Sequence, residues 1–105
     1  MARIVNDVEA FRADRAWGAL DLAEIDRVTV RLHWTDEPCK WHRNDGVEVF
    51  VVLDGTVDMH FREASNEKVV RLESRDMFIA FEGDEHVAHP VGETRILVIE
   101  RKGSV

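Results

Sequence analysis

The chain has 105 residues, enough for one compact domain, and its formal net charge is −7, from 14 basic and 21 acidic side chains. This acidic balance argues against nucleic acid and anionic membranes as partners, because both require a positively charged face. Hydrophobic residues make up 45% of the chain and charged residues 33%, a globular balance that excludes disorder. The single cysteine, Cys39, excludes an internal disulfide, and we interpret it as an inert thiol.

The sequence also indicates in which cellular compartment we expect the protein. No stretch approaches the ~20 apolar residues of a membrane-spanning helix. Charged residues interrupt every apolar run near Met1, so we expect no secretory leader. We therefore expect a cytoplasmic protein in a reducing compartment.

The first part of the chain, residues 1–26, is predicted to form an arm of mixed structure. Residues 3–5 fit a short strand, and Asp7 is a suitable N-cap for a helix over residues 8–17. Residues 19–25 fit either a loop or a helical turn. From residue 28 the pattern alternates, and Val28, Val30, Leu32 and Trp34 define the apolar side of a half-buried strand.

Further strands are predicted over residues 48–53, 56–62, 68–72, 77–81 and 94–100. Asp54-Gly55 is the strongest turn signal, and it predicts a two-residue hairpin between the first two of these strands. Ser65-Asn66 and Gly83-Asp84 mark other turns. Short strands at such regular spacing indicate an all-β barrel or sandwich.

The predicted hairpin places alternate side chains of its two strands on one shared face. That face consists of Glu48, Phe50, Val52, Val57, Met59 and Phe61. Because five of these six are apolar, we expect the face to point into the core, with Phe50, Met59 and Phe61 as candidates to line a pocket. A carboxylate there needs a cation, a hydrogen-bond donor or water. Glu48 is thus the first indication of a site, unless it lies at a solvated strand end or pairs with an arginine such as Arg43.

The histidines divide by position. His42 and Asn44 are two residues apart and point the same way if the segment is extended. We expect His33 to be solvated or at a partner interface, because it shares a face with Thr29 and Arg31. His60 is predicted on the face opposite Glu48, and His89 on the face opposite His86.

Two spacing patterns carry a family resemblance. His42, Asn44, Glu48 and Gly55 follow the pattern His-x-His-x3-Glu-x6-Gly. Arg75, Phe81, Gly83 and His86 follow the pattern Gly-x5-Pro-x-Gly-x2-His. Over residues 28–100 the sequence resembles the cupin superfamily, in particular the small single-domain cupins. The resemblance implies one domain over residues 1–105: a double-stranded β-helix, or jelly-roll barrel, of six to eight strands, with residues 1–26 as a short N-terminal arm.

The resemblance further implies that His42, Glu48 and His86 hold a divalent metal ion inside the barrel. Asn44 stands where the family has a second histidine, so it either ligates the metal or holds a metal-bound water. A set of two histidines and one carboxylate suits Fe, Mn or Zn, and Ni competes by affinity. Arg75 and Phe81 depart from the family's glycine and proline. Arg75 predicts a turn that does not need a positive φ, and Phe81 predicts a narrowed barrel end.

The leading functional interpretation is a small metal-binding cupin-like protein that acts on a small polar metabolite by dioxygenase, isomerase or lyase chemistry. No catalytic residue beyond the ligand set follows from the sequence. One alternative is a non-catalytic module that binds or senses a small ligand. Another is a structural dimeric barrel with an internal polar network. The resemblance also implies a homodimer.

Overall fold

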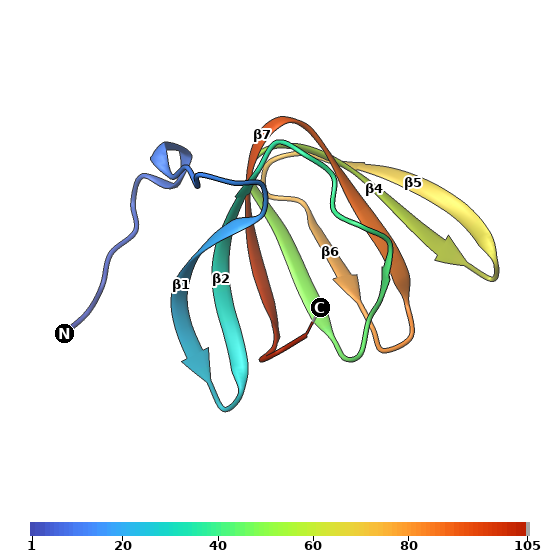
Figure 1. The fold of residues 1–105 in the computed structure, drawn as a ribbon, viewed down its shortest axis with the longest axis horizontal. Coiled ribbons are helices and arrows are strands. Elements are labelled where there is room, and N and C mark those ends of the chain that lie inside the picture. Colours follow the sequence, from blue (N-terminus) through green and yellow to red (C-terminus); the bar gives the residue numbers. More distant parts are fainter. Residues whose placement is uncertain (105) are drawn as a thin grey trace.

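The computed structural model describes residues 1–104, and almost all of its regular structure is antiparallel β-sheet (Figure 1). One 3-10 helix precedes the strands, and the elements in chain order are η1 (Val8–Ala10), β1 (Gly18–Ile25), β2 (Val28–Thr35), β3 (His42–Arg43), β4 (Glu48–Glu63), β5 (Asn66–Leu72), β6 (Met77–Ala80) and β7 (Glu85–Arg101). Within these residues the strand order is β1-β2-β7-β4-β5, while β3 pairs with β7 and β6 pairs with β4. The all-β prediction is confirmed.

The barrel is built around two long strands, β4 and β7, which pair with each other along most of their lengths. Their register shifts between Val52 and Thr56, and at this irregularity Gly55 has a φ of +100°. A Cβ atom at Gly55 would lie 2.8 Å from the Glu93 carbonyl oxygen. Gly55 therefore allows β7 to pass close to β4 where β4 changes direction.

The predicted hairpin at Asp54-Gly55 is wrong, because β4 continues through these residues and pairs with β7 on both sides of them. The predicted common face is nevertheless buried at Glu48, Phe50, Val52, Val57 and Met59. The irregularity changes the side-chain alternation by one position, as the hairpin would have done. The structure places the two-residue turns instead at Asp26-Arg27 and Ala64-Ser65, all four with positive φ, as type I′ turns require.

The arm differs most from prediction. Residues 3–5 form no strand, and the expected helix is reduced to η1, because Asp7 makes no side-chain cap. Residues 19–25 belong to β1, where pairing with β2 provides backbone hydrogen bonds that weak local propensity did not signal. Figure 1 shows the N-terminal segment running away from the barrel on the side of β1 and β2, opposite the β4–β5 hairpin.

The core lies between the two halves of the bent strands. Its buried members come from β4, β5 and β7: Phe50, Val52, Val57, Met59, Leu72, Ala88, Ile96 and Val98. On β2, Thr29, Arg31 and His33 pair with Glu100, Val98 and Ile96 of β7 and lie on the same side of the sheet as the core. The apolar side chains of β2 lie on the opposite side of the sheet. Two of them, Leu32 and Trp34, are also buried.

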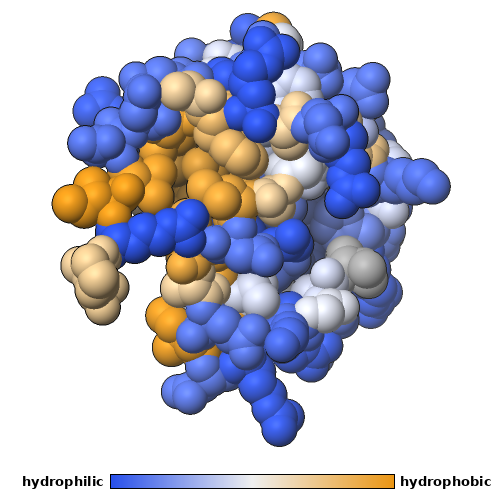
Figure 2. Space-filling model, turned by 60° about the vertical axis from the view of Figure 1, so that its left-hand side comes forward, coloured by the Kyte–Doolittle hydropathy of each residue, from blue (hydrophilic) through white to orange (hydrophobic). Residues whose placement is uncertain are grey.

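The side of the sheet that faces away from Glu48 carries apolar side chains across four strands. Cross-strand pairing aligns Val30 of β2, Ile99 of β7, Val49 of β4 and Ile79 of β6 in one row, and Ile79 is 45% exposed. We call this row the outer apolar face. Figure 2 shows apolar side chains gathered around a hollow in one part of the surface, with hydrophilic side chains over most of the rest. No helix of residues 1–104 is long and apolar enough to cross a membrane.

Gly55 provides a test of the bend. Replacing it with alanine introduces both a strained positive φ and a clash with Glu93 and Thr94, so Gly55→Ala should destabilise the fold by roughly 2–4 kcal/mol. Gly92→Ala is the matched control, because Gly92 has a φ of +74° but open space around its Cα, and should cost only about 1 kcal/mol. Urea unfolding measures both values, and equal losses would contradict the close approach of β7.

Candidate metal centre

Three side chains from three strands converge in the barrel. The Nε2 atom of His86 lies 3.4 Å from Oε1 of Glu48, and the Nε2 atom of His42 lies 3.8 Å from the same oxygen. The two imidazole rings contact each other, with centroids 4.2 Å apart. Each residue offers one ligand atom, and the three atoms lie within 4.8 Å of one another. This His42–Glu48–His86 group is the candidate metal centre.

Strand pairing explains the convergence. His42 is the direct cross-strand partner of His86 in the short β3–β7 ladder. The backbone of Asn44 extends this ladder, since its N–H donates to Asp84 O at 2.8 Å and its carbonyl accepts from Gly83 N–H at 2.8 Å. Glu48 begins β4 and enters from the other half of the barrel, where it pairs with Glu100 of β7.

The histidines are oriented so that their Nε2 atoms face Glu48. His42 Nδ1 lies 3.1 Å from the Lys40 carbonyl oxygen, so the tautomer that donates from Nδ1 leaves the Nε2 lone pair free for a metal. His86 is 2% exposed, and its Nδ1 has no hydrogen-bond partner among the described residues. Both Nε2 atoms therefore face the carboxylate, and of the two rings in the described chain His42 has a partner for its second nitrogen.

Asn44 joins the same group as a buried neighbour of the carboxylate. Its Nδ2 donates a hydrogen bond of 3.0 Å to Glu48 Oε1. Its Oδ1 is buried and has no partner within residues 1–104. An unsatisfied buried acceptor is costly, so this oxygen is well suited to a ligand or water that the group would hold.

The ionisation of the group follows from burial and mutual hydrogen bonding. Hydrogen bonding to Cys39 and to Glu48 raises the pKa of His42 to about 10. Burial alone would raise the pKa of Glu48, but hydrogen bonds from His42 and Asn44 outweigh it and lower that pKa. Burial lowers the pKa of His86. Without a metal, the group is therefore an imidazolium–carboxylate pair beside a neutral imidazole.

A cavity of about 410 Å³ adjoins the group. Besides the three candidate ligands, its walls come from the arm, the segment before β3, and β2, β4 and β7: Trp17, His33, Cys39, Lys40, Trp41, Phe50, Ala88, Val98 and Glu100. The expectation for His33 is wrong, because the polar side of β2 faces the barrel interior and His33 lines this cavity. His33 Nδ1 lies 3.0 Å from the Trp17 carbonyl oxygen, which ties the arm to the cavity wall.

Of the three predicted pocket residues, Phe50 alone is among the walls of this cavity. Phe50 lines the cavity, Met59 is fully buried in the core cluster, and Phe61 packs against Phe78 with ring centroids 5.6 Å apart. His60 and His89 contact each other, 4.3 Å apart, on the side of their strands that faces away from the group. The strand alternation that placed these two histidines away from Glu48 and His86 holds in the structure.

Two predictions from the second motif are wrong. Arg75 has a φ of +81°, so this turn does use the left-handed conformation for which glycine is preferred, and arginine adopts it at a steric cost. Phe81 is 60% exposed and does not narrow the barrel. Both residues lie outside the walls of the cavity.

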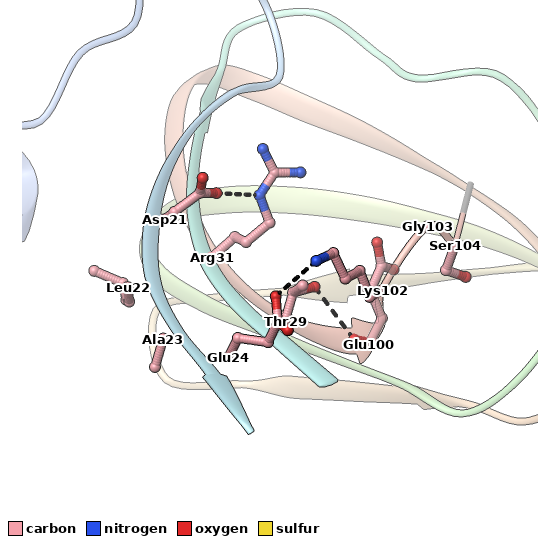
Figure 3. A pocket seen from close by; sticks show the side chains of 10 residues that line it. All are labelled: Asp21, Leu22, Ala23, Glu24, Thr29, Arg31, Glu100, Lys102, Gly103 and Ser104. Carbon is pink, nitrogen blue, oxygen red and sulfur yellow. Dashed lines mark hydrogen bonds and ion pairs between the residues drawn. The ribbon is translucent and has the colours of Figure 1, made fainter. Parts of the chain in front are cut away.

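A second cavity of about 710 Å³ lies beside the first and shares Glu100 with it. Figure 3 shows that its side chains come from β1, β2 and the end of β7. Its two cations are already paired, Arg31 with Asp21 at 2.7 Å and Lys102 with Glu24 at 3.2 Å. This neutralisation leaves the cavity next to the histidines as the better-formed candidate site.

Comparisons with known proteins identify the fold. No family model and no curated protein sequence matches the chain. Among solved structures, a cupin-2 domain-containing protein from Shewanella frigidimarina has 26% identity over 86% of this chain and 85% of its own, with a TM-score of 0.75. A cupin superfamily protein from Desulfitobacterium hafniense has 17% identity over 97% and 93%, with a TM-score of 0.78. Hydroquinone 1,2-dioxygenase in complex with Fe3+ has 15% identity over 86% of this chain and 29% of its own, with a TM-score of 0.76.

The fold and the spacing of the candidate ligands thus define an antiparallel barrel of the cupin type. The chain therefore has the fold of the small cupins to which it is similar.

Glu100 gives a pH prediction. Burial, helped by the charge of Glu48, raises the pKa of Glu100 to about 7. The pKa of Glu100 is higher in the folded protein than in the unfolded chain, so protonation of Glu100 favours folding. Its contribution to the free energy of unfolding is complete below about pH 4.3 and is lost as the pH rises through about 7. Glu100→Gln should therefore raise the melting temperature at pH 8 and change it little at pH 5, measured with chelator present.

The control is Glu82→Gln, because Glu82 is exposed in a turn. Its effect on the melting temperature should be the same at both pH values. A Glu100→Gln variant whose melting temperature follows the wild-type pH dependence would show that Glu100 ionises without penalty in the folded protein.

Proposed function

We propose that this small cupin-like protein binds one divalent metal ion through His42, Glu48 and His86 and uses it for chemistry on a small molecule. The proposal rests on one observation, the convergence of two Nε2 atoms on a single buried carboxylate oxygen. Two imidazoles and one carboxylate form a donor set that suits Fe, Mn, Zn or Ni. Asn44 is proposed as a fourth ligand or as the anchor of a water.

The surroundings support this proposal. The Lys40 carbonyl fixes the tautomer of His42, as partners of metal-ligating histidines usually do. The orphaned Oδ1 of Asn44 offers a further oxygen at the same group. One solved neighbour, hydroquinone 1,2-dioxygenase, is in complex with Fe3+. A bound ion would supply Lewis-acid or redox chemistry, of the dioxygenase, isomerase or lyase kind.

The protein's own residues would shape the reaction space. Trp17, Phe50 and Val98 wall the cavity and limit the access of water to the group. His33, with its pKa lowered by burial, stays neutral and offers a ring nitrogen to a ligand. The lone thiol of Cys39 at the same cavity is suited to a reducing compartment, and we place the protein in the cytoplasm.

We also propose that the chain is a single cupin domain that forms a homodimer through the outer apolar face. This face joins aliphatic side chains of four strands, and Met77 and Ile79 of β6 are 60% and 45% exposed on it. Contiguous apolar surface of this kind marks interaction sites, and a twofold contact pairs one face with its own copy.

The metal proposal predicts the effect of removing one ligand. Purified wild-type protein, reconstituted with Fe(II), Mn(II), Zn(II) or Ni(II), should retain about one ion per chain on gel filtration. His86→Ala should weaken binding by more than the roughly 10- to 100-fold that loss of an outer partner costs. Elemental analysis and calorimetric titration measure stoichiometry and affinity. His60→Ala is the control, because His60 lies away from the group.

A different result would identify the internal polar network instead. In that case wild-type protein binds none of the four ions, and Glu48→Gln is neutral or stabilising in the presence of chelator, since a buried amide costs less than a charge. A ligand role for Glu48 requires the opposite, a loss of the stabilisation that metal gives to the wild type.

The dimer proposal predicts a mass of twice 12.1 kDa by light scattering at micromolar concentration. Ile79→Asp places a charge on the outer apolar face and should shift the protein from dimer to monomer. The variant should still unfold cooperatively on heating, as followed by circular dichroism. Val69→Asp is the control, because Val69 is a similarly exposed strand residue on β5. A wild-type monomer would refute the dimer.

A further inference from the structure

The cavity beside the candidate metal centre has aromatic walls. Trp17, Trp41 and Phe50 come from three separate parts of the chain and line it together with the aliphatic Val98. Its volume of about 410 Å³ lies in the range of small-ligand sites, roughly 300–1,000 Å³. An apolar cavity of about 150 Å³ already holds benzene, so this one has room for a single substituted ring.

The charges around the cavity disfavour an anionic ligand. Outside the His42–Glu48–His86 group, Glu100 and Lys40 are its two charged wall residues. Among the walls, the one cation Lys40 stands against two carboxylates, Glu48 and Glu100, so without a bound metal ion an anionic ligand finds no spare positive charge to pair with. Arg31, the nearby guanidinium on β2, is already bound to Asp21. An uncharged ligand avoids these costs.

One aromatic wall is held in place from outside the cavity. The guanidinium carbon of Arg62 lies 4.0 Å from the centroid of the Trp41 ring. Arg62 is itself ion-paired with Glu85 of β7, so the cation is anchored. Trp41 is 37% exposed, and a partly exposed indole fixed by a cation forms a rigid wall for a planar ligand.

We propose that the cavity binds an uncharged single-ring aromatic alcohol, with the ring against Trp41 and Phe50 and the hydroxyl group toward His42, Glu48 and His86. This inference deepens the proposed metal-dependent function and rests on it for the role of the hydroxyl group. It replaces the expected small polar metabolite with an aromatic one. Arg62 is a positioning residue, since it acts on the ligand through Trp41.

The three tryptophans allow a direct test by nuclear magnetic resonance. Trp17 and Trp41 line the cavity, whereas Trp34 lies outside it and donates its indole N–H to Glu93 at 3.1 Å. Phenol is titrated into uniformly 15N-labelled protein, once with chelator and once with Zn(II). The indole signals of Trp17 and Trp41 should shift and saturate, while that of Trp34 stays fixed as an internal reference.

Two matched probes define the ligand class. Cyclohexanol has the size and hydroxyl group of phenol but no aromatic face, and benzoate has the ring but a negative charge. With chelator present, phenol should bind several-fold more tightly than cyclohexanol, which lacks the aromatic contacts. It should bind about 10-fold more tightly than benzoate, whose carboxylate would be buried near Glu48 and Glu100. Equal or tighter binding of either probe would overturn the proposed class.

Variants separate positioning from folding. Arg62→Ala should weaken phenol binding roughly 2- to 5-fold, the loss expected for one exposed cation–π contact, and leave Zn(II) affinity unchanged. Arg71→Ala is the control, because Arg71 pairs with Asp58 on the same hairpin and lies outside the cavity. Unchanged phenol affinity in Arg62→Ala would refute the role of Arg62.

The outcomes also separate this inference from the metal proposal. Saturable phenol shifts at Trp17 and Trp41 in protein that retains none of Fe(II), Mn(II), Zn(II) and Ni(II) would support the aromatic cavity and refute the metal-dependent function. Retained Zn(II) without any phenol shift would refute the aromatic ligand and leave the metal proposal standing.

Discussion

A single carboxylate on an interior face is the constraint around which this barrel is organised. Glu48 is 7% exposed, and a charge there persists only if hydrogen bonds and opposite charges replace the water it has lost. The structure supplies Asn44 from the same loop and His42 and His86 from across the barrel. The coupling between these groups explains why the pKa of His42 rises while that of Glu48 falls.

The long bent strands make this arrangement possible. β4 carries Glu48 at one end and core residues at the other, and β7 carries His86 at its start and Glu100 near its end. Each of these two strands therefore contributes residues to both halves of the barrel. The His42–Glu48–His86 group forms where the two halves face each other. This arrangement restricts the residue type at Gly55, where the backbones of β4 and β7 approach too closely for any side chain.

The cavity beside the group links the arm to the proposed chemistry. The arm contributes Trp17, which adopts a positive φ of 62° and whose carbonyl oxygen accepts a hydrogen bond from His33 Nδ1. Trp17 and Trp41 lie outside the two sequence motifs, so the walls that would select a ligand are separate residues from those that would hold a metal. A common fold can in this way host different chemistries.

The sequence by itself determined the all-β class and the interior face of Glu48, while the grouping of His42, Asn44 and His86 with Glu48 was only implied by a family resemblance in motif spacing. The first two features depend on local side-chain alternation, whereas the convergence of the group required the pairing of β3 and β4 with β7. Tertiary structure alone decided that Asp54-Gly55 is a bend instead of a hairpin turn, because the pairing of β4 with β7 competes with local turn preference. It also decided that the polar side of β2 faces inward, which brings His33 and Glu100 to the cavity, since only strand order fixes which side of a strand meets the core.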